Sequence, residues 1–268
     1  MTSPNPVPES DFPRDIVSVL WTGRLSCSQL AVHWISHSPP KPEALRKAEH
    51  AFWRQKLREN RAVRLFNGAL AELKDFHFQN GRLLLTLAPT DYRAFLYSNF
   101  HRRVVAETFG RNFVNQGLGI SALVRTRDGQ IVLMKRSAEV GEYPNRLDVF
   151  GGHIDPGVHV REGRPDPCLA IREELREELN VDPAEMSRPV VRGLIRNTET
   201  TKPELIFSVS VSLNQEELSA RARTAQDRFE LTELLYIPDQ KEALRTFLRR
   251  HFRDFSPSGF GSLLLKVV

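Results

Sequence analysis

The chain has 268 residues, of which 40% are hydrophobic and 26% charged, a composition typical of folded globular proteins. Because single domains usually hold roughly 100–200 residues, we expect one large domain or two modest ones. With 38 Lys and Arg against 33 Asp and Glu, the formal net charge is only +5. Nucleic-acid binders usually carry a stronger basic stripe with interleaved aromatic residues, so no nucleic-acid partner is predicted.

The sequence also favours a protein without a membrane partner. Its longest apolar runs, Leu83–Leu87 and Leu263–Leu265, are far shorter than the roughly 18 residues of a membrane helix. The N-terminus has prolines and acids where a signal peptide has a basic stretch and an apolar core. Two cysteines, Cys27 and Cys168, are too few for a disulfide framework. We therefore predict a cytoplasmic protein in a reducing compartment.

The first part of the chain predicts a small α+β module over residues 14–114. Residues 1–13, rich in Pro and Ser, are expected to form a disordered lead-in. The expected elements are a helix over 43–60, strands over 69–78 and 82–87, and a short helix after Thr90. Asn80-Gly81 between the two strands is a strong hairpin signal, and Thr90 is a good N-cap.

From residue 115 onward, strands and helices alternate. The expected elements are strands over 118–125 and 130–135, a loop opened by Phe150-Gly151-Gly152, a helix over 168–179, strands over 189–195, 205–213 and 234–237, and a helix over 240–252. This mixture predicts an α/β body over residues 115–268.

The helix over 168–179 carries the most informative charge pattern. Three like-charged pairs lie four residues apart: Arg172/Arg176, Glu173/Glu177 and Glu174/Glu178. Each such pair destabilises a helix by roughly 0.2–0.5 kcal/mol, whereas a salt-bridged surface helix would offset its signs by four residues. Only Glu173 and Arg176, three residues apart, attract each other. Surface ion pairing therefore does not explain this helix.

The same helix is predicted to bind a metal ion. At about 100° per residue, Ile171, Leu175 and Leu179 form one apolar stripe. Glu178 falls within the edge of that stripe, and Glu174 lies about 40° further round. Carboxylates at the margin of a buried face need a counter-charge, which a hard divalent cation bound by their oxygens supplies.

Gly151-Gly152, the following loop and Glu174–Val181 resemble the Nudix box, G-x5-E-x7-R-E-U-x-E-E-x-G-U with U apolar. Nudix hydrolases use divalent metal to cleave nucleoside diphosphates linked to another moiety. The chain is most similar to the UDP-glucose/UDP-galactose pyrophosphatase branch of animals. The segments that carry this likeness are Thr90–Leu96 with Asn99, Asp148–His153, Gly193–Asn197, and Asn180 at the usual Gly position of the box.

The resemblance spans most of residues 85–268. It implies an α/β fold, the Nudix α/β/α sandwich with a mixed sheet, preceded by the smaller α+β module. It also implies Mg²⁺, or Mn²⁺, held by Glu174, Glu178, Glu177 and the Gly152 carbonyl. Glu178 is the first candidate for the general base and Glu177 the second.

The chain departs from the signature at two coupled positions. Val158 stands where the signature has Glu, and Glu173 where it has Arg, while the loop before the helix is longer. The Glu and the Arg of the signature are thought to pair with each other. The loss of both therefore leaves neither charge without a partner. Glu162 in the longer loop is one candidate to replace the missing acid. Aligning Arg172-Glu173 with the signature's Arg-Glu would put Arg176 at a ligand position, so that register is rejected.

Six further residues are candidate substrate contacts. They are Arg136, Arg196, Asn197, Asp148, Tyr92 and Glu204. For each, a structural role is the alternative: a surface arginine, loop ordering, or packing of the module against the body.

The predicted function is Mg²⁺-dependent hydrolysis of a small-molecule UDP-sugar to UMP and a sugar 1-phosphate. One alternative is a pyrophosphatase for another nucleoside diphosphate derivative, such as ADP-ribose, NADH or coenzyme A. Another is a non-catalytic Nudix module that senses a nucleotide. Three retained helix carboxylates favour the enzyme, and the sequence predicts no particular oligomeric state.

Overall fold

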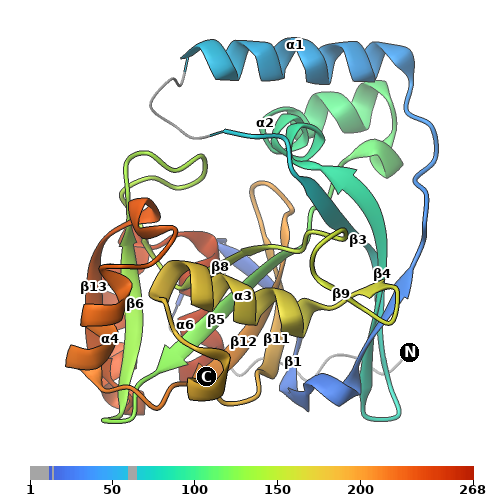
Figure 1. Ribbon diagram of the computed structural model, residues 1–268. Coiled ribbons are helices and arrows are strands. Elements are labelled where there is room, and N and C mark those ends of the chain that lie inside the picture. The colour runs from blue at the N-terminus through green and yellow to red at the C-terminus, as the bar shows by residue number, and fades with distance from the viewer. Residues whose placement is uncertain (1–11, 14, 60–64) are drawn as a thin grey trace.

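The computed structural model describes residues 12–13, 15–59 and 65–268. A large mixed sheet forms its centre (Figure 1). Its strands are β1 (Val17–Ser26), β5 (Gly119–Arg125), β6 (Gln130–Arg136), β7 (Leu147–Asp148), β8 (Phe150–His153), β11 (Val190–Asn197), β12 (Pro203–Ser210) and β13 (Leu231–Pro238). The strand order is β1-β11-β12-β5-β6-β13, with β8 paired to β5 and β7 to β6. The sheet is mixed because β12 runs parallel to β5, whereas β11 and β12 are antiparallel.

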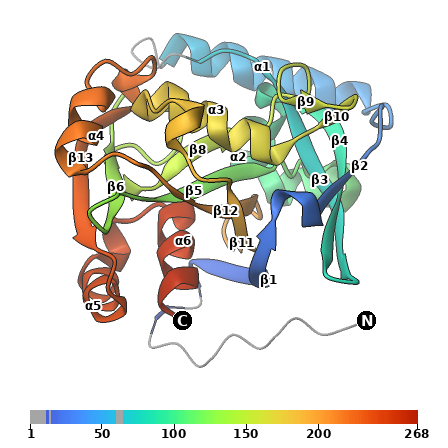
Figure 2. The same cartoon turned by 60° about the horizontal axis from the view of Figure 1, so that its bottom comes forward.

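Helices cover both faces of this sheet (Figure 2). The helices are α3 (Pro167–Leu179) and α4 (Gln215–Ala222) on one face, and α5 (Lys241–His251) and α6 (Pro257–Val267) on the other. Successive residues of β5 point to opposite faces: Ile120 and Ala122 pack in the core with α3, and Leu123 packs in the core with α5 and α6. The predicted α/β/α sandwich is confirmed. None of the helices in the described ranges combines the length and the hydropathy of a membrane span.

A smaller sheet lies against the larger one. It contains β2 (Leu30–Trp34), β3 (Ala69–Gln79) and β4 (Arg82–Asp91), and it is accompanied by α1 (Glu43–Glu59) and α2 (Tyr92–Thr108). The hairpin turn has φ 52° at Asn80 and 71° at Gly81, as the Asn-Gly pair predicts. Leu83, Leu85 and Leu87 of β4 are fully buried in the same core as α3. The two sheets therefore share one core.

The strand β1 belongs to the larger sheet although it lies early in the chain. Seven of its residues pair with β11 in antiparallel register, from Val17 opposite Asn197 to Ser26 opposite Val190. The predicted module over 14–114 therefore contains a strand of the other sheet. A domain boundary near residue 115 remains a prediction. Residues 1–11, which hold most of the predicted lead-in, lie outside the described ranges.

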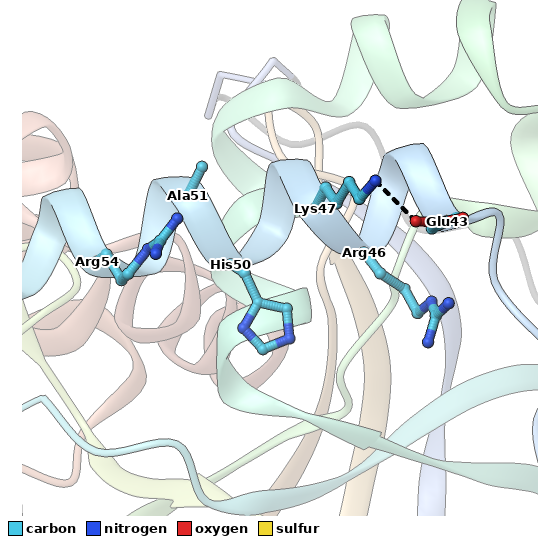
Figure 3. Close-up of a pocket in the computed structure, with 6 residues that line it drawn as sticks. All are labelled: Glu43, Arg46, Lys47, His50, Ala51 and Arg54. Carbon is cyan, nitrogen blue, oxygen red and sulfur yellow. Dashed lines mark ion pairs between the residues drawn. The ribbon is translucent and has the colours of Figure 1, made fainter.

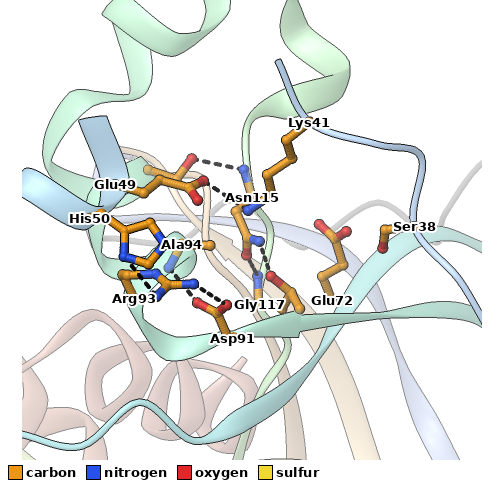
Figure 4. A network of polar contacts seen from close by, with 12 residues as sticks. Ser38, Lys41, Glu49, His50, Glu72, Asp91, Arg93, Ala94, Asn115 and Gly117 are labelled. Atoms are coloured by element: carbon orange, nitrogen blue, oxygen red, sulfur yellow. Dashed lines mark hydrogen bonds and ion pairs between the residues drawn. The ribbon is translucent and has the colours of Figure 1, made fainter. Parts of the chain in front are cut away.

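Polar contacts join α2 to β4 and to the linker before β5 (Figure 4). Asp91 Oδ1 accepts from the Ala94 backbone N–H at 2.9 Å, and its Oδ2 lies 3.0 Å from Arg93 Nη2. Asp91 rather than Thr90 is thus the N-cap of α2, which corrects the predicted start by one residue. Thr90 Oγ1 instead accepts from the Asn115 side-chain amide. These bonds fix the start of α2 above the sheet.

Cys27 and Cys168 are joined in a disulfide, which the sequence did not predict. Cys27 opens the short turn after β1, and Cys168 lies in the first turn of α3. The two cysteines are 141 residues apart in the sequence. They lie close together in the fold because β1 is an edge strand of the sheet that α3 covers. The expectation of two reduced cysteines is therefore corrected.

Reducing this disulfide is expected to lower thermal stability. Loss of a native cross-link typically costs about 2–5 kcal/mol, largely because the unfolded chain regains entropy. For a chain of this length the melting temperature should fall by roughly 5–15 °C. Thermal melts of the wild type with and without reductant, beside the Cys27→Ser/Cys168→Ser variant, measure this. A wild-type melt unchanged by reductant, and equal to that of the variant, contradicts it.

Candidate metal and active site

Both ends of α3 are defined by local chemistry. Asp166 caps the N-terminus by accepting from Cys168 N at 2.8 Å and Leu169 N at 3.1 Å, and Pro167 occupies the first turn. The helix ends at Asn180, which adopts the left-handed conformation with φ 53° and ψ 40°. Gly and Asn are the residues that tolerate this conformation, which explains Asn at the Gly position of the box.

The helix turns two of its carboxylates toward the core. Leu175 is fully buried on the predicted apolar stripe, and Glu178 beside it is only 2% exposed. Arg176 lies on the outer side, with Nε 2.7 Å from Glu173 Oε2. This arrangement supports the register in which Glu174 and Glu178, and not Arg176, occupy ligand positions.

The Gly151-Gly152 loop is bound directly to these carboxylates. Glu178 Oε2 accepts from the Gly151 backbone N–H at 2.9 Å. A Cβ on Gly152 would lie 2.3 Å from Glu174 Oε1. Gly151 has φ 152°, and a Cβ there would meet the Ile120 carbonyl at 2.0 Å. Only glycine at both positions permits this approach.

Two further acids reach the cluster from the loop before β13. Asp227 donates its backbone N–H to the Glu177 carbonyl at 2.9 Å, and the Glu230 carbonyl accepts from Ser137 N at 2.8 Å. Their negative charges raise the pKa of Glu177 and Glu178 in addition to burial. The sequence analysis missed both residues because they lie far from the box and follow no spacing rule. The predicted strand over 234–237 begins three residues later than β13, which starts at Leu231 directly after Glu230.

Burial and mutual repulsion both favour the protonated, uncharged forms of these carboxylates. Burial, followed by the charge of Glu177, raises the pKa of Glu174 to about 8. Burial, then Glu230 and Glu174, raises the pKa of Glu178 well above its ordinary value, and Arg136 opposes the rise. The metal-free cluster therefore carries protons near neutral pH.

The donor set fits a hard divalent cation. Within the described part of the chain, Glu178 Oε1 is buried without a hydrogen-bond partner. Carboxylate and carbonyl oxygens are the ligands that Mg²⁺ and Mn²⁺ prefer. In residues 12–13, 15–59 and 65–268, no three His, Cys, Asp or Glu side chains converge on one point. Binding therefore requires the carboxylates to rotate toward a common ion.

Arg136 is a buried cation beside this cluster. Its Nη1 lies 3.4 Å from Asp148 Oδ2, and its Nε donates to the Glu142 carbonyl at 3.1 Å. Burial alone lowers the pKa of Arg136, but Asp148, Glu230 and Glu178 raise it overall. Arg136 is therefore not a solvated surface arginine. Asp148 orients the guanidinium of Arg136 and also accepts a hydrogen bond from the Ser258 hydroxyl on α6.

Three other candidates have partners within the protein. Asn197 Nδ2 donates to the Tyr143 hydroxyl at 2.6 Å, and its Oδ1 accepts backbone N–H groups of the following turn. Arg196 Nη2 lies 3.4 Å from Gln116 Oε1. The ring of Tyr92 packs near those of Trp53, Phe95 and His153 and joins α2 to the body.

Glu204 lies on the sheet and is buried. It accepts from the Ser121 hydroxyl, and its Oε2 lies 3.8 Å from Lys202 Nζ. Burial, opposed by Lys202 and Ser121, raises its pKa to about 7. A Cβ on Gly119 would occupy the place of its carboxylate, 2.0 Å from Oε2. Glu204 is thus a further buried acid in this region, separate from those on α3.

The departures from the box leave no buried unpaired charge. Val158 is 67% exposed. Glu173 is paired with Arg176 at the surface. Glu162 lies at the exposed turn between β9 (Val160–Arg161) and β10 (Arg164–Pro165), and its role as a replacement acid stays a prediction.

A concavity lies along the exposed face of α1 (Figure 3). Its lining residues are Glu43, Arg46, Lys47, His50, Ala51 and Arg54. All belong to one helix, and none is a predicted site residue.

The metal-free protein is expected to lose stability as pH rises from about 5 to 8. The pKa of Glu174 is 4.5 in an unperturbed chain and about 8 in the fold. The folded state therefore binds more protons between these values, and its free energy of unfolding falls by about 2–4 kcal/mol as they dissociate. Melts in EDTA of the wild type and Glu174→Gln measure this. As pH rises, the melting temperature of the wild type should fall relative to that of Glu174→Gln, and Mg²⁺ should restore it. A difference between the two melting temperatures that does not change with pH contradicts the raised pKa of Glu174.

The comparisons with known proteins agree with the box. No family model matches the chain. The uridine diphosphate glucose pyrophosphatase NUDT22 of Mus musculus is 29% identical over 206 residues, covering 69% of this chain and 67% of that protein. The Homo sapiens protein of the same name is 25% identical over 205 residues, covering 69% and 68%.

A plant relative and a solved structure also carry the name Nudix hydrolase. Nudix hydrolase 9 of Arabidopsis thaliana is 25% identical over 245 residues, covering 78% of each chain. The structure of a NUDIX hydrolase from Nitrosomonas europaea is 14% identical with a TM-score of 0.36, covering 55% of this chain and 86% of that one. The α3 motif and the curated relatives together support a place for this chain in the Nudix superfamily of hydrolases.

Proposed function

We propose that this Nudix hydrolase cleaves the diphosphate of a UDP-sugar, such as UDP-glucose or UDP-galactose, to give UMP and a sugar 1-phosphate. The observation that carries the proposal is the buried carboxylate cluster of α3 packed against Gly151-Gly152. The substrate class is supported by the similarity to two mammalian proteins named uridine diphosphate glucose pyrophosphatase. The three retained carboxylates favour an enzyme over a nucleotide sensor.

Mg²⁺, or Mn²⁺, would be held by Glu174 and Glu178, with Glu177 and the Gly152 carbonyl as further ligands. Such an ion neutralises a diphosphate and lowers the pKa of bound water. Glu230 adds a carboxylate that the sequence analysis did not include.

Glu178 is the proposed general base. The Gly151 N–H holds its Oε2, and its Oε1 is buried without a partner in the described structure. A carboxylate oxygen in this position can accept a proton from an attacking water. Glu177, which is more exposed and is paired at 3.5 Å with Arg176, is the second candidate.

Arg136 is the proposed ligand of the diphosphate, because a buried guanidinium forms strong charge-assisted hydrogen bonds to phosphate oxygens. Asp148 would act through Arg136 by orienting it. The partners of Asn197 and Tyr92 favour positioning roles, in the turn and at the α2 joint respectively. Arg196 and Glu204 stay candidates for direct substrate contact.

Product chromatography with a substrate panel tests the proposal. The purified protein would be incubated with Mg²⁺ and UDP-glucose, UDP-galactose, ADP-ribose, NADH or coenzyme A. UMP from the UDP-sugars alone is the expected result. AMP from ADP-ribose or NADH would retain the metal site but overturn the uridine assignment. Thermal stabilisation by one compound without any cleavage would favour the sensor.

A cytoplasmic location and a small-molecule partner, without nucleic acid or membrane, belong to the same proposal. The Cys27–Cys168 disulfide is an observation against a reducing compartment, where such bonds are rare. Trapping the thiols with an alkylating reagent before lysis, followed by mass spectrometry, decides between the two: two alkylated cysteines support the cytoplasmic location.

A further inference from the structure

The segment between β6 and β7, residues 137–146, is tied at two points to the turn between β11 and β12. Glu142 Oε2 lies 3.3 Å from Lys202 Nζ, and the Tyr143 hydroxyl accepts from Asn197 Nδ2 at 2.6 Å. The side chains of Glu142 and Lys202 are only 18% and 15% exposed. The first contact is thus a largely desolvated ion pair between two segments distant in sequence.

Lys202 also contacts two other elements. Its Nζ lies 3.8 Å from Glu204 Oε2 on β12 and 5.3 Å from the ring centroid of Phe95 on α2. Burial opposes its charge, but Glu142 and Glu204 together raise its pKa above the ordinary value. A buried ammonium of this kind is stable only while its partners stay in place, so it holds them together.

The contact of Lys202 extends through Glu142 to Arg136. The backbone carbonyl of Glu142 accepts from Arg136 Nε at 3.1 Å, while Asp148 holds the other end of the guanidinium. The segment that carries Glu142 bends through two non-glycine residues with positive φ, Tyr143 at 48° and Asn145 at 61°. Each such residue costs of order 1 kcal/mol, so side-chain contacts must hold this conformation.

We infer that Lys202 is a positioning residue that acts through Glu142 to fix residues 137–146, and with them the guanidinium of Arg136 beside the α3 carboxylates. This inference rests on the proposed function only for the role of Arg136 in binding the diphosphate. Lys202 itself stays with Glu142, Glu204 and Phe95 and does not touch the substrate. Nothing in the box pattern identifies it.

Steady-state kinetics with UDP-glucose test the inference in the wild type, Lys202→Met, Glu142→Gln and the double variant. A displaced Arg136 should raise KM by roughly 3- to 30-fold, with a smaller effect on kcat. Because both residues act through one contact, the double variant should be no worse than the more affected single variant. Effects that multiply in the double variant would show that Lys202 contacts the substrate itself and would overturn the inference.

Hydrogen exchange of peptides from residues 137–146, measured without ligand, provides a second readout. Exchange should be faster in both single variants and unchanged in Lys266→Met. This control breaks an ion pair of 2.8 Å with Asp239 outside the network. Unchanged exchange and unchanged KM in Lys202→Met and Glu142→Gln overturn the inference.

The two proposals fail in different ways. If the wild type cleaves no member of the panel, the proposed function has failed, and faster exchange in residues 137–146 still supports the positioning role. Glu142→Gln leaves Lys202 paired with Glu204, so this variant carries the test if Lys202→Met does not fold.

Discussion

Replacing Glu178 by Gln is expected to lower kcat for nucleotide-sugar hydrolysis by about 10²–10⁴-fold. Gln keeps the size of the side chain and can still accept from the Gly151 N–H, but it can neither take a proton from water nor bind a cation as strongly. The melting temperature of the metal-free protein should not fall, because a neutral amide replaces a carboxyl group whose pKa is already raised by burial, Glu230 and Glu174. Initial rates with Mg²⁺, together with thermal melts, measure both effects.

Glu173→Gln is the matched control on the same helix. Glu173 is ion-paired with Arg176 at the surface, and such pairs contribute less than about 1 kcal/mol. Its rate should stay within about twofold of wild type, since it lies off the buried face. A Glu178→Gln variant that keeps more than a tenth of the wild-type rate would show that the register of the box or the assignment of the base is wrong.

Replacing Gly152 by Ala is expected to lower kcat/KM by about 10²-fold, the cost of displacing a catalytic group by about 1 Å. The added Cβ would lie 2.3 Å from Glu174 Oε1, so the carboxylate must move. The Mg²⁺ concentration for half-maximal rate should rise, because the displaced group is a proposed ligand. Titrating the rate with Mg²⁺ in the wild type and the variant measures this shift.

Gly157→Ala is the control for this loop. Its added Cβ meets only the Asp155 carboxylate, at 3.2 Å, and the residue is exposed. Its Mg²⁺ dependence should match the wild type. The account of the Gly-Gly contact is wrong if Gly152→Ala behaves in the same way as Gly157→Ala.

The carboxylate face of α3 could be predicted because one helix contains all of its determinants. The 3.6-residue period places Glu178 on the buried stripe of Ile171, Leu175 and Leu179, and the structure buries all four. The like-charged pairs four residues apart excluded an ordinary surface helix. Local geometry and charge therefore sufficed for this part of the candidate site.

Residues that reach the site from distant segments could not be predicted in this way. Glu230 ends a short 3-10 helix before β13, and Lys202 lies just before β12. The positions of both depend on strand pairing, and the sequence around each follows no recognisable motif. The partners of Asn197 and Tyr92 arise from the same long-range packing. A pattern within one segment carries no information about such contacts.

The same limit applies to parts of the fold. The pairing of β1 with β11 and the Cys27–Cys168 disulfide join segments more than 140 residues apart in the chain. The helix α6 was missed because its apolar run Leu263–Leu265 was considered only as a candidate membrane segment. In the structure this run lies in a helix capped by Ser256 and buried against the sheet.

A phosphorus-31 NMR time course of UDP-glucose with the wild-type protein tests the central claim most directly. With Mg²⁺, the two diphosphate resonances should be replaced by two phosphomonoester resonances, those of UMP and glucose 1-phosphate. Without Mg²⁺, or with Glu178→Gln, the diphosphate resonances should persist. Persistent diphosphate resonances in the wild type with Mg²⁺, or loss at the wild-type rate with Glu178→Gln, would contradict the assignment of α3 as the catalytic helix of a UDP-sugar hydrolase.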